Sequence, residues 1–263
     1  MNLIYAVILG AVQGVAEFLP ISSSGHLVIV GELLTSLSGR GLPEWLQGMT
    51  MNVALHFGTL LSIATIYFRD LLGLLRQVRV LLLIVISSVP AGVAGLLFKD
   101  QLDALFQNAL AAGFCLLVTA GVLLTAKRLQ GVNRNLSELS MGSALTIGLF
   151  QAVAILPGIS RAGSTVGAGL MFGLRPQDAA KFSFFLAVPA IGGASLLELL
   201  DLLKHGESTA PEFLPMVAGM AVSYVVGVFS LRSLIRLLAA DRLHWFAWYC
   251  GTVGVLTIVW QLQ

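Results

Sequence analysis

The chain contains six long apolar segments, and they constrain its fold more than any other feature. They cover residues 50–68, 80–98, 108–126, 182–200, 213–230 and 245–262. A helix needs about 20 predominantly apolar residues to cross the hydrocarbon core of a membrane. Only 11% of the chain is charged, whereas soluble proteins average about 25%. We therefore predict an all-α polytopic membrane protein with six transmembrane helices.

Basic residues divide the connecting loops into two sets. Loops 69–79, 127–140 and 231–242 carry three Lys or Arg each, whereas connections 35–49, 99–107 and 201–212 carry one each, namely Arg40, Lys99 and Lys204. Because positive residues favour the cytoplasmic side of a membrane, we expect the first set inside and the second outside. The net charge of +2 gives no indication of nucleic-acid binding.

Residues 10–31 and 148–169 form an internal repeat. Aligned without a gap, they are identical at nine of 22 positions. Each copy reads as an apolar helix, a break rich in Pro, Ser and Gly, and a second apolar helix. Since the residue before a proline avoids helical geometry, we expect the first helices to end near Leu19 and Leu156.

The loop assignment also places these two copies. Segment 1–34 has to enter and leave on the outer face and segment 141–173 on the cytoplasmic face, so each is predicted to be a re-entrant helix pair. Each half of the chain then holds one such pair and three spanning helices. Because three is odd, halves 1–126 and 127–263 form an inverted-topology repeat within a single membrane domain, and their breaks meet near the midplane.

Gln13 and Glu17 are four residues apart and share one helix face. Glu17 is a carboxylate within apolar sequence, where an ionised group needs a partner, a metal or a wet pocket. It is either a functional group or a partner of Arg161 that only locks the two halves together, and the hydroxyls around it favour function. His56, in contrast, is expected to be a packed, hydrogen-bonded histidine.

Three serines and a histidine lie where the second helix of the first pair should begin: Ser22, Ser23, Ser24 and His26. A helix N-terminus offers free N–H groups and the positive end of the helix dipole, which suits an anion. The serines either only cap this helix or supply donors and a nucleophile. The adjacent histidine, which can act as base, acid or nucleophile, favours chemistry.

The second break carries complementary groups. Gly158 allows the backbone to come close, and Arg161 has a planar donor fork that suits phosphate oxygens. The hydroxyls there belong to Ser160, Ser164 and Thr165. Together the two breaks are predicted to form an oxyanion cradle, and the carboxylate side could hold a divalent cation that neutralises a diphosphate.

These motifs resemble a known family. Gln13-x-x-x-Glu17 matches the (E/Q)xxxE element of the bacterial undecaprenyl-diphosphate phosphatases, the bacitracin-resistance family. Pro157-Gly-Ile-Ser-Arg-Ala-Gly-Ser-Thr165 matches their PGxSRSxxT element, and Pro20-Ile-Ser-Ser-Ser-Gly-His26 fits their first loop. The resemblance covers essentially the whole chain.

The resemblance implies a phosphatase of the bacterial plasma membrane that removes the terminal phosphate of a C55 polyprenyl diphosphate. Its product is the lipid carrier for cell-wall synthesis, and the activity confers resistance to bacitracin. By motif, the catalytic positions are Glu17, Ser23, His26 and Arg161, supported by Gln13, Ser160 and Thr165. Ser22, Ser24, Gly158 and Ser164 complete the candidate substrate-binding set.

The family also implies a divalent metal, Mg²⁺ or Ca²⁺, with Glu17 and Gln13 as candidate ligands. Two positions depart from the family pattern. Gln13 replaces the glutamate of many members, which leaves one carboxylate for the metal. Ala162 replaces the serine after the arginine, so that hydroxyl is not essential here.

Several alternatives stay open. We prefer Ser23 as nucleophile with His26 or Glu17 managing the proton, but attack by His26 or by water is compatible with the sequence. A polyprenyl-phosphate flippase or other transporter could use the same architecture and anion pocket, although it has no use for the serine, histidine and glutamate. The expected partners are the lipid substrate and membrane lipid, with access from the outer, periplasmic side. A homodimer is left open.

Overall fold

The computed structural model describes residues 2–38, 42–98, 101–102, 105–106, 108–205 and 212–263. Arg40 and Lys99, which entered the loop counts, lie outside these residues. Over the described ranges the chain is helical, with one isolated bridge between Arg134 and Leu174. The helices are α1 (Asn2–Ala16), α2 (Ser23–Ser38), α3 (Glu44–Gln47), α4 (Met49–Ile66), α5 (Phe68–Leu74), α6 (Val78–Leu97), α8 (Ala109–Leu129), the 3₁₀ turn η1 (Leu136–Glu138), α9 (Met141–Val153), α10 (Arg161–Met171), α11 (Pro176–His205), α12 (Phe213–Ala239) and α13 (His244–Gln261).

Among the described residues, five helices are long and apolar enough to cross a membrane: α4, α6, α8, α11 and α12. Each covers one of the predicted apolar segments. α13 covers the sixth segment but is not among the five, because its ends carry polar residues and tryptophans that lower its mean hydropathy. Only 28–44% of the residues in these spans are buried within the protein. Their exposed residues include Val85, Leu96 and Phe229, as expected for helices that face lipid.

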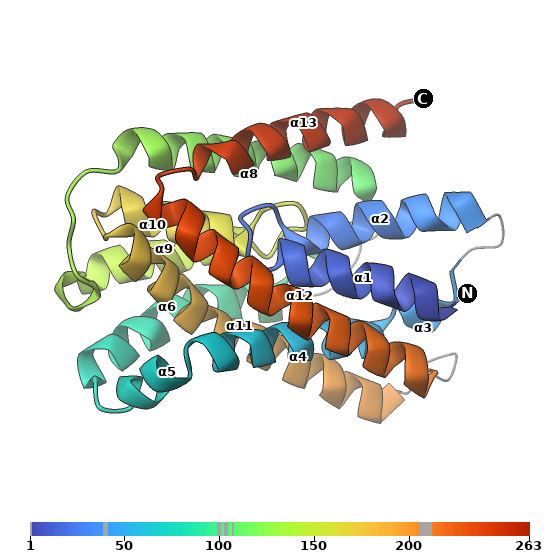
Figure 1. The fold of residues 1–263 in the computed structure, drawn as a ribbon, viewed down its shortest axis with the longest axis horizontal. Coiled ribbons are helices and arrows are strands. Elements are labelled where there is room, and N and C mark those ends of the chain that lie inside the picture. The colour runs from blue at the N-terminus through green and yellow to red at the C-terminus, as the bar shows by residue number, and fades with distance from the viewer. Residues whose placement is uncertain (1, 39–41, 99–100, 103–104, 107, 206–211) are drawn as a thin grey trace.

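The three basic loops lie together at one end of the helix bundle, opposite the N-terminus and α3 (Figure 1). Side chains tie these loops to their neighbours. Lys127 forms an ion pair with Asp241 beyond α12, and Arg79 donates to the carbonyl oxygen of Leu139 at 3.0 Å. The predicted grouping of the basic loops is therefore found in the fold.

Each copy of the internal repeat forms two helices joined by a break. α1 and α2 lie side by side between the end that carries the N-terminus and the middle of the molecule, and α9 and α10 occupy the opposite half (Figure 1). α1 ends at Ala16 and α9 at Val153, three residues before the predicted positions of Leu19 and Leu156. The difference arises because the last turn before each proline loosens while retaining single helical hydrogen bonds, such as Leu19 N to Val15 O at 3.2 Å.

Small residues allow these broken helices to pack closely against the opposite half of the chain. α1 packs on α12, and α9 packs on α6. A Cβ added at Gly10 would lie 2.4 Å from Gly219 O, and one added at Gly148 would lie 2.4 Å from Ser87 O. Gly10 and Gly148 are equivalent positions of the repeat, so both crossings depend on the same small residue.

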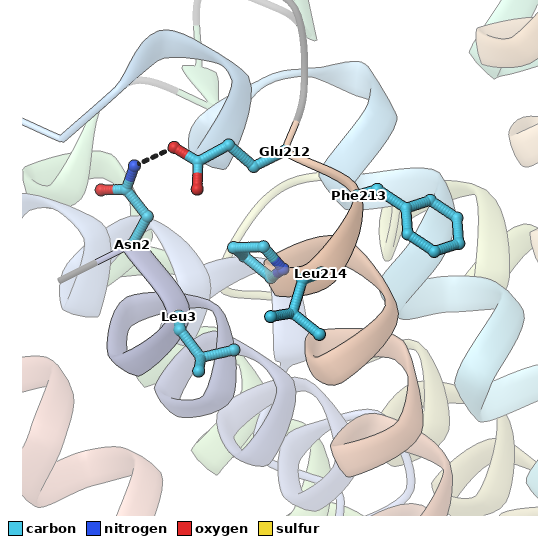
Figure 2. A pocket seen from close by; sticks show the side chains of 6 residues that line it. Asn2, Leu3, Glu212, Phe213 and Leu214 are labelled. Atoms are coloured by element: carbon cyan, nitrogen blue, oxygen red, sulfur yellow. Dashed lines mark hydrogen bonds between the residues drawn. The ribbon is translucent and has the colours of Figure 1, made fainter.

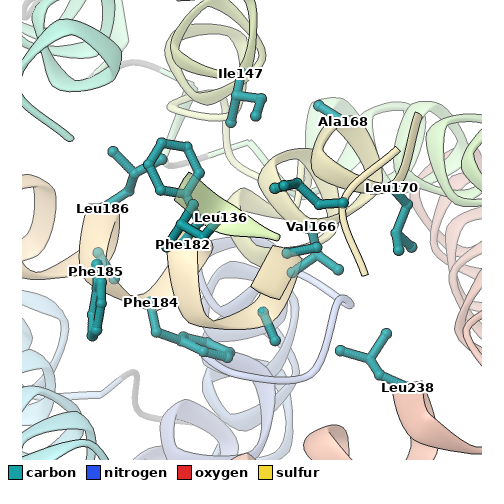
Figure 3. Packing of buried hydrophobic residues seen from close by; sticks show 14 of the residues in the cluster. Leu136, Ile147, Val166, Ala168, Leu170, Phe182, Phe184, Phe185, Leu186 and Leu238 are labelled. Atoms are coloured by element: carbon teal, nitrogen blue, oxygen red, sulfur yellow. The ribbon is translucent and has the colours of Figure 1, made fainter. Parts of the chain in front are cut away.

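A buried apolar cluster fixes α10 against α11 (Figure 3). Phe182, Phe184 and Leu186 of α11 are 0–1% exposed, and they pack with Val166 and Leu170 of α10. In a membrane such contacts stabilise the fold through close van der Waals packing rather than through removal of apolar surface from water. The cluster holds the start of α10 beside the first turns of α11, which is where the second break presents its polar groups.

Candidate active site

The two helix breaks touch each other. Ser22 Oγ accepts hydrogen bonds from the N–H of Gly158 at 3.1 Å and of Gly25 at 3.3 Å. A Cβ added at Gly25 would lie 2.7 Å from Gly158 Cα. Ser22 itself has a φ of +72°, a left-handed conformation that is costly for a residue with a side chain. Ser22 therefore caps α2 and joins the first break to the second.

Gly158 and its neighbours fix the second break on α8. Gly158 has a φ of +98°, and a Cβ there would lie 2.4 Å from Ala112 O. Thr119 of α8 donates to Gly158 O at 2.8 Å and accepts from Ser160 N at 2.9 Å. Ser160 caps α10 as predicted, accepting from Gly163 N at 3.0 Å. No local sequence pattern indicates the role of Thr119, because its partner Gly158 lies 39 residues further along the chain.

Glu17 is the centre of the polar cluster and is only 6% exposed. Its Oε1 atom accepts from Arg161 Nη2 at 2.8 Å. Its Oε2 atom accepts from Ser23 Oγ at 2.6 Å and from Gln13 Nε2 at 3.2 Å. The carboxylate thus gathers an arginine, a hydroxyl and an amide, and the predicted proximity of Gln13, Glu17, Ser23 and Arg161 is observed.

Arg161 is held by groups on α10 and α11. Its Nη1 donates to Ser183 O at 3.1 Å, and its guanidinium carbon lies 5.9 Å from the ring centroid of Phe184. Thr165 Oγ1 bonds Arg161 O at 2.8 Å and Ser183 Oγ at 2.6 Å. Thr165, which is predicted to bind substrate, supports Arg161 through these hydrogen bonds. The Nε atom of Arg161 is buried without a hydrogen-bond partner in the described part of the chain.

His26 is 9% exposed and bonds away from the serine nucleophile candidate. Its Nδ1 lies 2.8 Å from Ser22 O, and its Nε2 lies 2.9 Å from the Tyr249 hydroxyl. From the sequence, His26 and Glu17 are alternatives for accepting the proton of Ser23. In the structure, Ser23 Oγ is hydrogen-bonded to Glu17.

His56 of α4 faces the same carboxylate. Its Nδ1 lies 2.9 Å from Asn52 O, and its Nε2 lies 3.9 Å from Glu17 Oε2. The expectation of a hydrogen-bonded histidine is correct, and the ring in addition borders the polar centre. No local pattern in the sequence marks this role.

Two further predicted residues lie near the breaks. Ser24 Oγ is 3.3 Å from Ser22 Oγ. Ser164 is 2% exposed in the first turn of α10, and its N–H donates to Ser160 O at 2.8 Å. Both therefore belong to the cap region of a helix that begins at a break.

Among the described residues, few oxygen atoms at this centre are free to bind a divalent metal. Both oxygens of Glu17 already accept hydrogen bonds, and the remaining acceptor is Gln13 Oε1, which is buried without a partner among the described residues. Within those residues no group of three or more His, Cys, Asp or Glu is placed to hold a metal ion. Mg²⁺ in proteins is usually held by one or two carboxylates, with waters and substrate phosphates as its other ligands, so the single carboxylate of this centre would supply only part of a coordination shell.

Two pockets on the protein lie away from the polar centre. A pocket of 510 Å³ lies between the N-terminal ends of α1 and α12, where Asn2 and Glu212 are hydrogen-bonded (Figure 2). None of the predicted site residues lines it. At the centre itself, Arg161 is 14% exposed and His56 is 23% exposed, so these side chains mark the side from which a ligand would arrive.

Fold and site together define a multi-pass helical membrane protein with a buried polar centre where two broken helices meet. The chain belongs to the family described as bacitracin resistance protein BacA, whose model matches residues 6–256.

Curated relatives match along their whole length. The undecaprenyl-diphosphatase of Rhodopirellula baltica is 44% identical, covering 100% of this chain and 99% of that protein. The undecaprenyl-diphosphatase of Methanosphaera stadtmanae is 35% identical, covering 98% of each chain. That of Trichlorobacter lovleyi is 38% identical over 97% of this chain and 96% of its own.

Proposed function

We propose that this chain is a membrane phosphatase that hydrolyses undecaprenyl diphosphate to undecaprenyl phosphate and inorganic phosphate. One observation carries the proposal: Ser23 Oγ lies 2.6 Å from a carboxylate whose other oxygen is paired with Arg161. A nucleophile, a base and a cation are thus gathered in one buried centre, as phosphoryl transfer requires. Full-length relatives named undecaprenyl-diphosphatase support the same substrate.

In the proposed reaction, Ser23 Oγ attacks the terminal phosphorus while Glu17 Oε2 accepts the hydroxyl proton. The bond between this phosphorus and the bridging oxygen breaks, and undecaprenyl phosphate leaves with the bonding electrons. Water then attacks the phosphoserine, releasing inorganic phosphate and regenerating the hydroxyl. Glu17 passes the proton of the first step to the departing undecaprenyl phosphate. In the second step it takes a proton from the attacking water and gives one to Ser23 Oγ as the phosphoserine bond breaks, so that the cycle closes.

Arg161 would stabilise the charge that develops on the transferred phosphoryl group, the electrostatic contribution that usually dominates such reactions. Its buried Nε has no partner among the described residues, which supports a position where a phosphate oxygen accepts a hydrogen bond. The N-terminus of α10, where Arg161 is the first residue, adds the positive end of a helix dipole.

Any divalent cation that assists is proposed to arrive with the substrate, held mainly by diphosphate oxygens. This follows from the donor set, in which Glu17 is already engaged by three donors and Gln13 offers one amide oxygen. The protein residues then need to supply only one or two contacts to the ion.

We further propose the membrane arrangement predicted from the sequence, with six spanning helices, two re-entrant pairs and inverted halves 1–126 and 127–263. The equivalent crossings of α1 on α12 and of α9 on α6 support it. The basic loops at one end are proposed to be cytoplasmic. The pair α1–α2 would then open to the outer side, and the lipid diphosphate would reach Ser23 from there.

The test is phosphate release from undecaprenyl diphosphate by the purified protein in detergent. Glu17→Gln and Arg161→Ala are expected to lower the rate at least about 100-fold, since each removes charge that acts in the transition state. Glu32→Gln is the matched control, because Glu32 on α2 bonds Gln261 rather than the centre. A folded parent that binds the lipid without releasing phosphate would overturn hydrolysis and favour transport.

A further inference from the structure

The hydrogen bonds of His26 determine which of its nitrogens carries the proton. Nδ1 lies 2.8 Å from the carbonyl oxygen of Ser22, and a carbonyl oxygen can only accept a hydrogen bond. Nδ1 must therefore bear the hydrogen, and Nε2 of the neutral ring is the acceptor. The Tyr249 hydroxyl, 2.9 Å away, is then the donor to Nε2.

Tyr249 comes from α13 and reaches the first break together with its neighbour. Its ring stacks on His26 with centroids 5.6 Å apart and an interplanar angle of 12°. The next residue, Cys250, is fully buried, and its Sγ donates to Pro20 O at 3.6 Å. Two consecutive residues of α13 thus contact the first break: Cys250 contacts it before the serines and Tyr249 after them.

These contacts from α13 lie next to a strained residue of the break. Ser22 has a φ of +72°, and its carbonyl oxygen accepts from both Nδ1 and the backbone N–H of His26, the latter at 3.2 Å. Ser22 Oγ in turn binds Gly158 N. Such strain persists only where surrounding contacts over-determine it. Ser23, the next residue, has its direction set by this turn.

We propose that Tyr249 is a positioning residue. By donating to Nε2 it holds the His26 ring against Ser22, and so maintains the strained turn that aims Ser23 Oγ at Glu17. In this arrangement His26 has no free nitrogen with which to attack phosphorus or to accept the Ser23 proton. The assignment of a positioning role rests on the proposed phosphatase function, whereas the assignment of the hydrogen bond does not.

Tyr249→Phe keeps the stacked ring and removes only the donor. We expect kcat to fall about tenfold, the upper range for one hydrogen bond, while KM changes less than about twofold because Ser23 contributes to the chemical step. Tyr224→Phe is the matched control, since among the described residues the Tyr224 hydroxyl bonds an exposed Thr65 at 3.2 Å and no residue of the breaks. In a His26→Ala background, Tyr249→Phe should have no further effect.

Three kinetic results would overturn the proposal. The first is a parental kcat in Tyr249→Phe, and the second is an equal loss with and without His26. The third is a higher rate in Tyr249→Phe, which would mean that a freed Nε2 does the chemistry.

Nitrogen NMR of the unaltered protein tests the hydrogen bond without any variant or turnover, with His26→Ala assigning the signal. A protonated Nδ1 and an unprotonated, hydrogen-bonded Nε2 are expected, and a protonated Nε2 on the neutral ring would overturn the assignment. A parent that released no phosphate would instead refute the proposed function, so the two failures are distinguishable.

Discussion

Glu17 Oε1 and Arg161 Nη2 form an ion pair 2.8 Å long across the two helix breaks. Glu17 is buried at 6% exposure and Arg161 is partly buried at 14%, and each comes from a different half of the chain. The pair therefore serves both interpretations that the sequence left open. It joins the halves, and it places a carboxylate beside a hydroxyl and a guanidinium where phosphate chemistry can occur.

Removing one partner of this pair is expected to destabilise the protein strongly. Arg161→Ala leaves a buried carboxylate without its cation, which typically costs about 3–5 kcal/mol of unfolding free energy. In Glu17→Gln/Arg161→Met no charge is left unpaired, so the double variant should be more stable than Arg161→Ala, although inactive. Denaturant or thermal unfolding in detergent compares them. An Arg161→Ala protein as stable as the parent would exclude this role for the pair.

Gly158 is expected to tolerate no side chain. Gly158→Ala combines a φ of +98° with a Cβ placed 2.4 Å from Ala112 O, so either the break or α8 must move. We expect a loss of more than about 1 kcal/mol in stability together with most of the activity. Gly121→Ala on α8 is the control, since nothing lies within 4 Å of its Cβ. Equal effects at the two glycines would contradict the close contact of the breaks.

Thr119 is expected to matter through its hydroxyl rather than its shape. Thr119→Val leaves Gly158 O and Ser160 N buried without their partner, which costs about 1–3 kcal/mol. Thr125→Val should be close to neutral, because Thr125 is exposed and its hydroxyl donates to Gly121 O of its own helix at 2.8 Å. Unfolding curves and phosphate release measured on both proteins check the difference.

Much of this site could be predicted from sequence because local rules decide it. Ser160 caps α10, since a serine ahead of an apolar helix accepts a backbone N–H. Gln13 and Glu17 meet because residues four apart share a helix face. The breaks lie near Pro20 and Pro157 for the steric reason that proline disfavours helix before it.

The remaining contacts could not be predicted because they depend on how distant helices pack. Tyr249 meets His26 across 223 residues, and Thr119 meets Gly158 across 39. His56 reaches Glu17 only because α4 lies beside the break. Thr165 belongs to the motif that carries the family resemblance, yet its hydroxyl supports Arg161 and Ser183. A motif therefore identifies which residues lie at the site but not which pairs of them are in contact.

Asp241, in the turn after α12, offers a pH test at the end of the bundle that holds the basic loops. Hydrogen bonds from Lys127 and Gln130 lower the pKa of this carboxyl below its ordinary 3.8. A lowered folded-state pKa contributes stability above the unfolded value and loses it as pH falls through the folded one. Asp241→Asn tolerates the same left-handed φ of +58°. Its stability deficit should be constant from pH 7 to about pH 5 and should shrink below about pH 4; a deficit that grows on acidification would contradict the assignment.

The most direct test of the central claim follows the phosphoryl group itself. Undecaprenyl diphosphate labelled at its terminal phosphate is mixed with excess enzyme, quenched within one turnover and digested for peptide analysis. The account predicts a labelled phosphoserine at Ser23 and neither label nor appreciable phosphate release in Ser23→Ala. Label on His26, or a Ser23→Ala protein that releases phosphate at the parental rate, would contradict it.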